Sequence, residues 1–102
     1  MAQMVQAIEN LTRIEGHILA RKAHPHLDAY DIVTLQLERT ASVPEKADLL
    51  TAQTGTTIEV SVRRELLKGA QIGARLRCRA KRTPDGAMCE PHPEPADIEI
   101  VE

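Results

Sequence analysis

Apolar and polar residues alternate along several short stretches of this chain, and turn-forming residues separate those stretches. Successive side chains of an extended strand point to opposite faces, so this alternation predicts half-buried β-strands. A chain of 102 residues is long enough for one domain with a modest core and too short for two. We therefore predict a single, mostly β domain that spans residues 1–102. The predicted strands cover residues 11–21, 30–40, 56–64, 74–83 and 96–102.

Five strands of this length fit a small closed barrel. The predicted inner face of the first strand consists of Ile14, Gly16, Ile18 and Ala20. A glycine inside a strand allows a bend, and a bent first strand can pair with both the second and the fourth. Closure also removes exposed strand edges. We therefore predict an all-β, five-stranded closed barrel of the oligonucleotide/oligosaccharide-binding (OB) type, with a flat sandwich or a split α+β sheet as alternatives.

The connections between the predicted strands contain two helical signals and one loop. Pro44 near the start of "SVPEKADLLTAQTG" and Gly55 beyond its end predict a short helix between the second and third strands. Residues 65–68 predict a helical turn between the third and fourth strands. Residues 83–95 contain a Pro-Asp-Gly turn and three further prolines, which predict a loop. Residues 1–10 are predicted to form an N-terminal arm or a helical turn.

The core is predicted to be aliphatic, because Tyr30 is the single aromatic residue. Cys78 falls on the inward register of the fourth strand, where a small buried side chain is expected. The chain contains no secretory signal and no apolar run as long as a membrane span. We therefore expect a cytoplasmic protein without membrane association, in which Cys78 and Cys89 are reduced thiols.

Charge is segregated along the chain although the net charge is only −2. Residues 63–82 contain eight cations and one acid, whereas residues 83–102 contain six acids and no cation. Within the basic segment, "ARLRCRAKRT" places a cation at every second position. In a strand these side chains project to one side about 6.6 Å apart, a scale similar to the phosphate repeat of an extended single strand. Arginine also binds phosphate with two hydrogen bonds at once.

This row of cations predicts a face that binds nucleic acid. Neighbouring cations widen the face, and Tyr30 is the one ring that could stack on a base. The predicted binding residues are Arg75, Arg77, Arg79, Lys81, Arg82, Lys68, Arg63, Arg64, Arg21, Lys22 and Tyr30. The alternative is that Asp97 and Glu99 of the last strand pair with these arginines across the sheet.

Two short motifs resemble the bacterial single-stranded-DNA-binding proteins. "NLTRIEGHI" places Asn10, Ile14, Gly16 and Ile18 as the opening strand of that family does, and "LKGAQI" is similar to its approach to the fourth strand. The length and the ending "ADIEIVE" are similar to those of the short, dimeric primosomal replication protein B branch. The resemblance implies an OB fold and binding of single-stranded DNA. Since this chain lacks the stacking tryptophan and phenylalanine and the long tail of the tetrameric members, electrostatics would supply most of the affinity.

Metal and enzyme chemistry find little support in the sequence. Four histidine and cysteine residues, which could bind a metal ion, lie near one another in two short stretches. They lack the paired Cys-x2-Cys spacing of structural zinc sites, so we predict that they are loop residues. These residues are His24, His26, Cys89 and His92. His17 and Glu15 are predicted to be a surface pair rather than an acid–base pair. No phosphate loop, nucleophile elbow or metalloprotease motif is visible, and we predict no metal, no cofactor and no enzyme activity.

The favoured prediction is a non-catalytic protein that binds single-stranded DNA through an arginine-rich strand face. The alternative is a protein–protein adaptor or accessory subunit whose acidic C-terminal segment meets a basic partner. A homodimer is expected, because Met4, Val5 and Ile8 offer apolar surface near the N-terminus.

Overall fold

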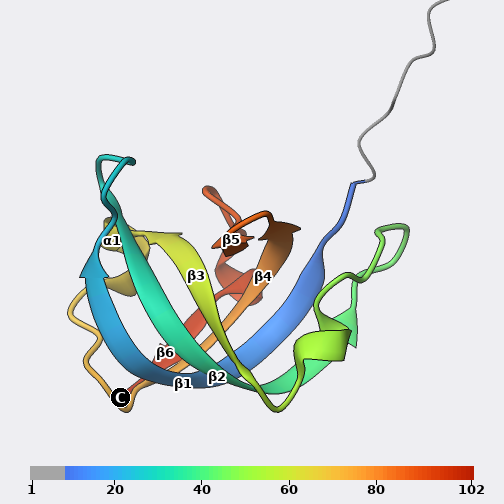
Figure 1. The fold of residues 1–102 in the computed structure, drawn as a ribbon, viewed down its shortest axis with the longest axis horizontal. Coiled ribbons are helices and arrows are strands. Elements are labelled where there is room, and N and C mark those ends of the chain that lie inside the picture. The colour runs from blue at the N-terminus through green and yellow to red at the C-terminus, as the bar shows by residue number, and fades with distance from the viewer. Residues whose placement is uncertain (1–8) are drawn as a thin grey trace, which may run out of the picture.

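The computed structural model describes residues 9–102 and contains a closed β-barrel (Figure 1). Its five strands are β1 (Thr12–Ala23), β2 (Tyr30–Ser42), β3 (Thr57–Arg63), β4 (Arg75–Thr83) and β5 (Gly86–Cys89). They pair in the order β1-β2-β3-β5-β4, and β4 pairs again with β1 to close the circuit. Every pairing is antiparallel except that of β3 with β5. The predicted all-β, OB-like barrel is confirmed.

Strand β1 contacts two neighbours because it bends at Gly16. Its pairing with β2 shifts register between Glu15 and Gly16, and its first half also pairs with β4. A Cβ atom on Gly16 would lie 2.0 Å from the carbonyl oxygen of Gln36, so no larger residue fits without movement of the backbone. The bend predicted at this glycine therefore coincides with the bulge that lets β1 join the two sides of the barrel.

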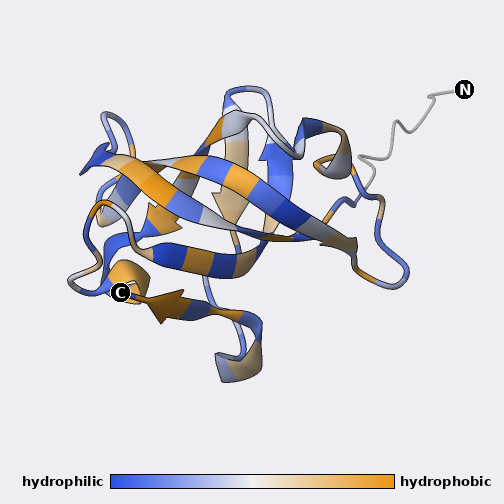
Figure 2. Cartoon of the chain, turned by 90° about the horizontal axis from the view of Figure 1, so that it is seen from below, coloured by the Kyte–Doolittle hydropathy of each residue, from blue (hydrophilic) through white to orange (hydrophobic). Residues whose placement is uncertain are grey.

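The core is aliphatic, as predicted, and the alternation of apolar and polar residues is visible along the strands (Figure 2). Its largest fully buried side chains are Ile14, Ile18, Val33, Leu35, Leu37, Leu50, Val60, Val62, Leu67 and Leu76. Ala20, predicted to face inward, is exposed because a second register shift follows Ile18. Cys78 and Cys89 are buried, free thiols. A hydrogen bond with Cys89 and burial raise the pKa of Cys78, so this thiol stays protonated and unreactive.

The predicted loop over residues 83–95 is wrong, because it contains the strand that closes the barrel. After the Pro84–Asp85 turn, β5 pairs with β4 on one side and with β3 on the other. The strand shows only two cycles of alternation, with Ala87 and Cys89 buried, which is too short to stand out from its proline-rich surroundings.

The strand predicted from Ala96 is present as β6 (Glu99–Val101), but it is not a barrel strand. It follows a 3-10 turn, η2 (Pro95–Asp97), and pairs with β4 only. Figure 2 shows η2 and β6 on the outer edge of the barrel wall. The chain therefore has a sixth strand outside the closed circuit.

The two predicted helical segments have different outcomes. The turn between β3 and β4 is confirmed as α1 (Arg64–Leu67), with Leu67 buried in the core. Between β2 and β3 there is only a 3-10 turn, η1 (Thr51–Gln53), because Asp48 binds the backbone N–H groups of Leu50 and Thr51 and anchors the segment to the hydroxyl of Thr12.

Residues 1–8 of the predicted N-terminal arm lie outside the described part of the chain. Asn10 forms a parallel bridge with Ala47. Within residues 9–102, no helix combines the length and the apolar character needed to cross a membrane.

Candidate nucleic-acid interface

The predicted row of cations lies on the outer face of β4. Leu76, Cys78 and Ala80 point into the barrel, whereas Arg75, Arg77 and Arg79 alternate with them on the outside. The predicted geometry of the row is therefore correct. Its availability to a ligand depends on what each guanidinium group contacts.

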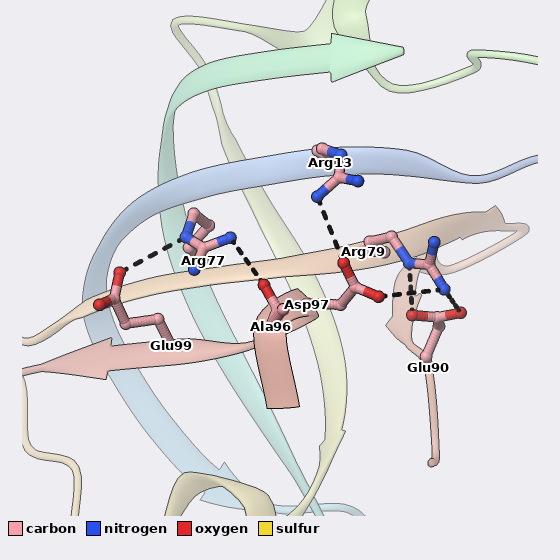
Figure 3. Close-up of polar contacts among 7 residues, drawn as sticks. All are labelled: Arg13, Arg77, Arg79, Glu90, Ala96, Asp97 and Glu99. Atoms are coloured by element: carbon pink, nitrogen blue, oxygen red, sulfur yellow. Dashed lines mark hydrogen bonds and ion pairs between the residues drawn. The ribbon is translucent and has the colours of Figure 1, made fainter. Parts of the chain in front are cut away.

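Arg79 and Arg77 are paired with carboxylates (Figure 3). Arg79 donates to both carboxylate oxygens of Glu90, through Nε and Nη2, each at 2.7 Å. These hydrogen bonds raise the pKa of Arg79. The Nε of Arg77 lies 3.5 Å from Glu99, and its Nη1 donates to the carbonyl oxygen of Ala96 at 3.4 Å. The middle of the row is therefore engaged inside the molecule.

Asp97 bridges two arginines that face each other across neighbouring strands. Arg13 of β1 is the register partner of Arg79 on β4, an arrangement in which like charges repel. Asp97 lies 3.3 Å from Nη1 of Arg13 and 3.6 Å from Nη2 of Arg79 (Figure 3). Its carboxylate thus offsets the repulsion between the two strands.

The ion-paired part of the β4 face, which excludes Lys81, has no net charge. Four cations, Arg13, Arg75, Arg77 and Arg79, meet four carboxylates, Glu15, Glu90, Asp97 and Glu99. Arg75, whose side chain is 50% exposed, lies 3.6 Å from Glu15, a contact as long as that of Arg79 with Asp97. Of the two arrangements that the sequence left open, pairing of Asp97 and Glu99 with the arginines is the one present.

Arg21 and Arg64, predicted to widen the binding face, clamp the buried Asp31 instead. Their Nε atoms lie 2.7 Å and 2.9 Å from its two oxygens. Arg21 also donates to the carbonyl oxygen of Ala70 at 2.7 Å. Burial by itself raises the pKa of Asp31, but the hydrogen bonds from Arg21 and Arg64 outweigh that effect and lower it. These two arginines stabilise one end of the barrel.

Arg63 is also engaged inside the molecule. It donates to the carbonyl oxygen of Pro91 at 2.8 Å and contacts His92 and Glu65. Tyr30 begins β2 and lies half-buried beside the Ala23 end of β1. Lys81 follows the pairing of Ala80 with Thr12, at the other end of β1. Tyr30 and the end of β4 therefore do not form one site.

Lys81 and Arg82 end β4 and line a hollow of about 470 Å³, which we call the basic hollow. Its polar lining comprises Glu9, Asn10, Lys46, Lys81, Arg82 and Thr83. Three cations face one carboxylate there, and that carboxylate accepts a hydrogen bond from Lys46. Within residues 9–102, neither Lys81 nor Arg82 forms an ion pair.

Two residues of the basic hollow were missed in the sequence. The side-chain oxygen of Asn10 accepts a hydrogen bond from the backbone N–H of Arg82 at 2.6 Å. This bond holds the segment before β1 against the end of β4. Its position in the family motif was the one signal that pointed to it. Lys46 comes from the loop after β2, and no sequence pattern connects it with Lys81.

A second hollow, of about 630 Å³, lies between the β1–β2 loop and the β4–β5 turn. We call it the acidic groove, and its lining includes Lys22, His24, Leu27, Glu59, Asp85 and Met88. OB barrels often bind extended ligands in this region. Here two carboxylates face one ammonium group, so the groove repels phosphate more than it attracts it.

The predicted loop histidines do not come together with Cys89, which is buried in β5 and is not the loop residue that was predicted. Within residues 9–102, no three His, Cys, Asp or Glu residues are arranged to hold a metal ion. Nδ1 of His24 accepts hydrogen bonds from the backbone N–H groups of His26 and Leu27, each at 3.0 Å, and so shapes its own loop. His17 lies 2.8 Å from Glu38, not from Glu15 as predicted, because the two neighbouring strands bring them together.

Comparison with protein-family models, with curated proteins and with solved structures gives no match, so function is inferred from the residues of this chain alone.

Proposed function

We propose that this protein is a non-catalytic binding module that holds single-stranded nucleic acid, DNA in the first place, through the basic hollow. One observation carries the proposal: Lys81 and Arg82 lie beside Lys46 in a hollow that contains a single carboxylate. Cations without a carboxylate partner attract phosphate most strongly. Of the residues predicted from the sequence, Lys81 and Arg82 are thus the centre of the proposed site.

The charges of the hollow set the expected strength of binding. Each phosphate that the protein neutralises on a single strand contributes about −0.7 to the slope of log affinity against log salt concentration. Lys46 is already paired with Glu9, so Lys81 and Arg82 give a slope of about −1.4. No aromatic residue lines the hollow, so base stacking adds nothing there. Binding should be weak, salt-sensitive and nearly independent of base sequence.

A double charge reversal tests the site. K81E/R82E should remove about 1.4 from the magnitude of the salt slope and weaken binding of labelled oligo(dT) at low salt by about tenfold or more. Fluorescence anisotropy over a salt series measures both quantities. The matched control is K22E/R39E, which makes the same change in net charge at two cations outside the basic hollow and without ion pairs in residues 9–102.

The control should keep the slope of the original chain. Equal losses in the two variants would mean that net charge alone drives binding, and the basic hollow would not be a site. Failure of the original chain to bind oligo(dT) at low salt would overturn the proposal entirely.

The second candidate is an adaptor that meets a basic protein partner through its C-terminal segment. The observation in its favour is a hollow of about 350 Å³ between α1 and β6, where Glu65, Glu99 and Glu102 face Lys68. Ile98 and Ile100 add apolar surface to it. A basic peptide that binds the original chain but not E99K/E102K, together with no binding of oligo(dT), would favour the adaptor.

A homodimer and a cytoplasmic location belong to the same proposal. The dimer rests on Met4, Val5 and Ile8, which lie outside the described residues. Sedimentation velocity of the full chain tests it, and a sedimentation coefficient typical of an 11.3 kDa monomer at all concentrations would exclude the dimer.

A further inference from the structure

The segregation of charge along the sequence becomes a contact in the fold. Residues 91–102, which we call the C-terminal strap, contain four acids and no cation. Two of those acids, Asp97 and Glu99, lie against arginines of the barrel wall (Figure 3). The strap therefore brings negative charge to the face that the sequence predicted for nucleic acid.

Arg63 holds the start of the strap through Pro91 and His92, whereas the half that carries Asp97 and Glu99 is attached to the barrel by few interactions. Strand β6 pairs with β4 over three residues and lies outside the closed circuit of strands. Ile98 and Ile100 are only half-buried against the core. The exposed pair of Glu99 with Arg77 contributes about 0–1 kcal/mol, and added salt weakens it. Asp97 is 15% exposed, but its contacts with Arg13 and Arg79 are long, at 3.3 Å and 3.6 Å. Another polyanion can therefore compete with the strap for the same cations.

The two strap carboxylates are spaced like phosphates. Asp97 ends η2 and Glu99 begins β6, and Ile98 between them is extended, so the Cα atoms of Asp97 and Glu99 lie about 6.6 Å apart. Asp97 sits between Arg13 and Arg79, and Glu99 sits beside Arg77. Lys81 is the next outward residue of β4 after Arg79, so this face continues directly into the basic hollow.

We infer that the strap is an intramolecular mimic of a nucleic-acid backbone and covers a latent extension of the binding site. This inference rests on the proposed function. A strand that binds in the basic hollow competes with Asp97 and Glu99: in the original chain it displaces them in a minor fraction of the complexes, and it then contacts Arg13 and Arg77 in their place. Glu90 remains paired with Arg79, because the backbone N–H of Glu90 also donates to the carbonyl oxygen of Arg79 at 3.0 Å. The latent extension therefore adds two phosphate contacts, at Arg13 and Arg77.

Neutral substitution of the two contacting carboxylates tests the inference. In D97N/E99Q the cations are uncovered, so two further phosphates contribute about 1.4 to the magnitude of the salt slope. The loss of oligo(dT) affinity between about 50 and about 200 mM salt should then be roughly 5–10-fold larger than in the original chain. Fluorescence anisotropy with an oligo(dT) that spans the face measures this change.

The matched control is E94Q/E102Q. It removes the same two charges from the same strap, and neither residue forms an ion pair within residues 9–102. Its salt slope should equal that of the original chain. Equal slopes in the two variants would refute the mimic, because only the general charge of the strap would then matter.

Hydrogen exchange on the unmodified chain gives a second, independent measurement. Bound oligo(dT) should increase amide exchange in residues 99–101, whereas the ladder between β1 and β2 should keep its protection. Unchanged or slower exchange in the strap would refute its displacement, even where D97N/E99Q fails to fold.

The failures of the two proposals differ. If the original chain binds and K81E/R82E loses binding while D97N/E99Q behaves as E94Q/E102Q does, only the mimic is wrong. If D97N/E99Q binds and adding K81E/R82E to it changes nothing, the basic hollow is wrong and the mimic holds. If no variant binds, both are wrong.

Discussion

Arginine and aspartate meet in two regions of this molecule, with different consequences. At the end of the barrel, Asp31 is buried and accepts hydrogen bonds from Arg21 and Arg64 at 2.7 Å and 2.9 Å. On the β4 face, Asp97 reaches its two arginines only at 3.3 Å and 3.6 Å. The first cluster connects β1, β2 and α1 at one end of the barrel, whereas the second connects the barrel to the strap.

The difference lies in hydrogen-bond geometry more than in burial or residue type, because the Asp97 side chain is only 15% exposed against 8% for Asp31. A buried charge must keep its partners, because removing one leaves an unpaired charge away from water. In the strap, Glu99 is 59% exposed, and such an exposed group exchanges its partner for water or another ion at little cost. Identical residue types therefore serve the stability of the barrel in one place and a displaceable contact in the other.

The largest loss of stability in the barrel is expected from a substitution at Gly16. In Gly16→Ala the new Cβ would meet the carbonyl oxygen of Gln36 at 2.0 Å, so the bulge of β1 must open. We expect a loss of about 3 kcal/mol or more in the free energy of unfolding, measured by urea titration. Gly69→Ala is the control, since nothing lies within 4 Å of the position that its new Cβ would take. Similar values for the two variants would contradict the assigned bend.

Acid should weaken the barrel through Asp31 and Asp48. Hydrogen bonds from Thr51 are the main cause of the lowered pKa of Asp48. Burial raises the pKa of Asp31, but hydrogen bonds from Arg21 and Arg64 outweigh burial and lower it. A carboxyl whose folded pKa lies below its unfolded value of about 3.9 stabilises the protein above that pH. This stability is lost as the pH falls through the folded pKa. Urea midpoints between about pH 7 and pH 3 measure the loss, and D31N should reduce its size.

The smallest change in stability is expected from a substitution in the strap. Glu99 is 59% exposed and lies 3.5 Å from Arg77, so E99Q should change the free energy of unfolding by less than about 1 kcal/mol. The same urea titration at neutral pH measures this change. A loss above about 2 kcal/mol would show that the ion pair belongs to the stability of the barrel and that the strap is not displaceable.

Strand positions were largely predictable because alternation reports burial directly. Residues 30–40 and 56–64 alternate cleanly, and β2 and β3 occupy them. Gly16 in β1 also indicated a closed barrel, because a bend there lets β1 pair with both β2 and β4. β5 was missed because four residues next to prolines carry too little pattern, and the helix after β2 was wrong because the side chain of Asp48 organises that segment instead.

The candidate site was less predictable than the fold. Lys81 and Arg82 were named from the sequence, and their outward positions follow from the register of β4. Lys46 and Asn10 come from distant segments that only the closed barrel brings to the end of that strand. Arg77 and Arg79 are paired with carboxylates only because residues 90–99 fold back against β4.

The sequence by itself determined the strands, the aliphatic core, the bend at Gly16 and the outward row of cations. These follow from local periodicity and from the size of single side chains. Only the tertiary structure decided which cations meet a carboxylate, because an ion pair depends on the separation of two segments that the chain order leaves open. The strap covers Arg13 and Arg77 while Lys81 and Arg82 line the basic hollow, and that distinction arises from the path of the chain after β5.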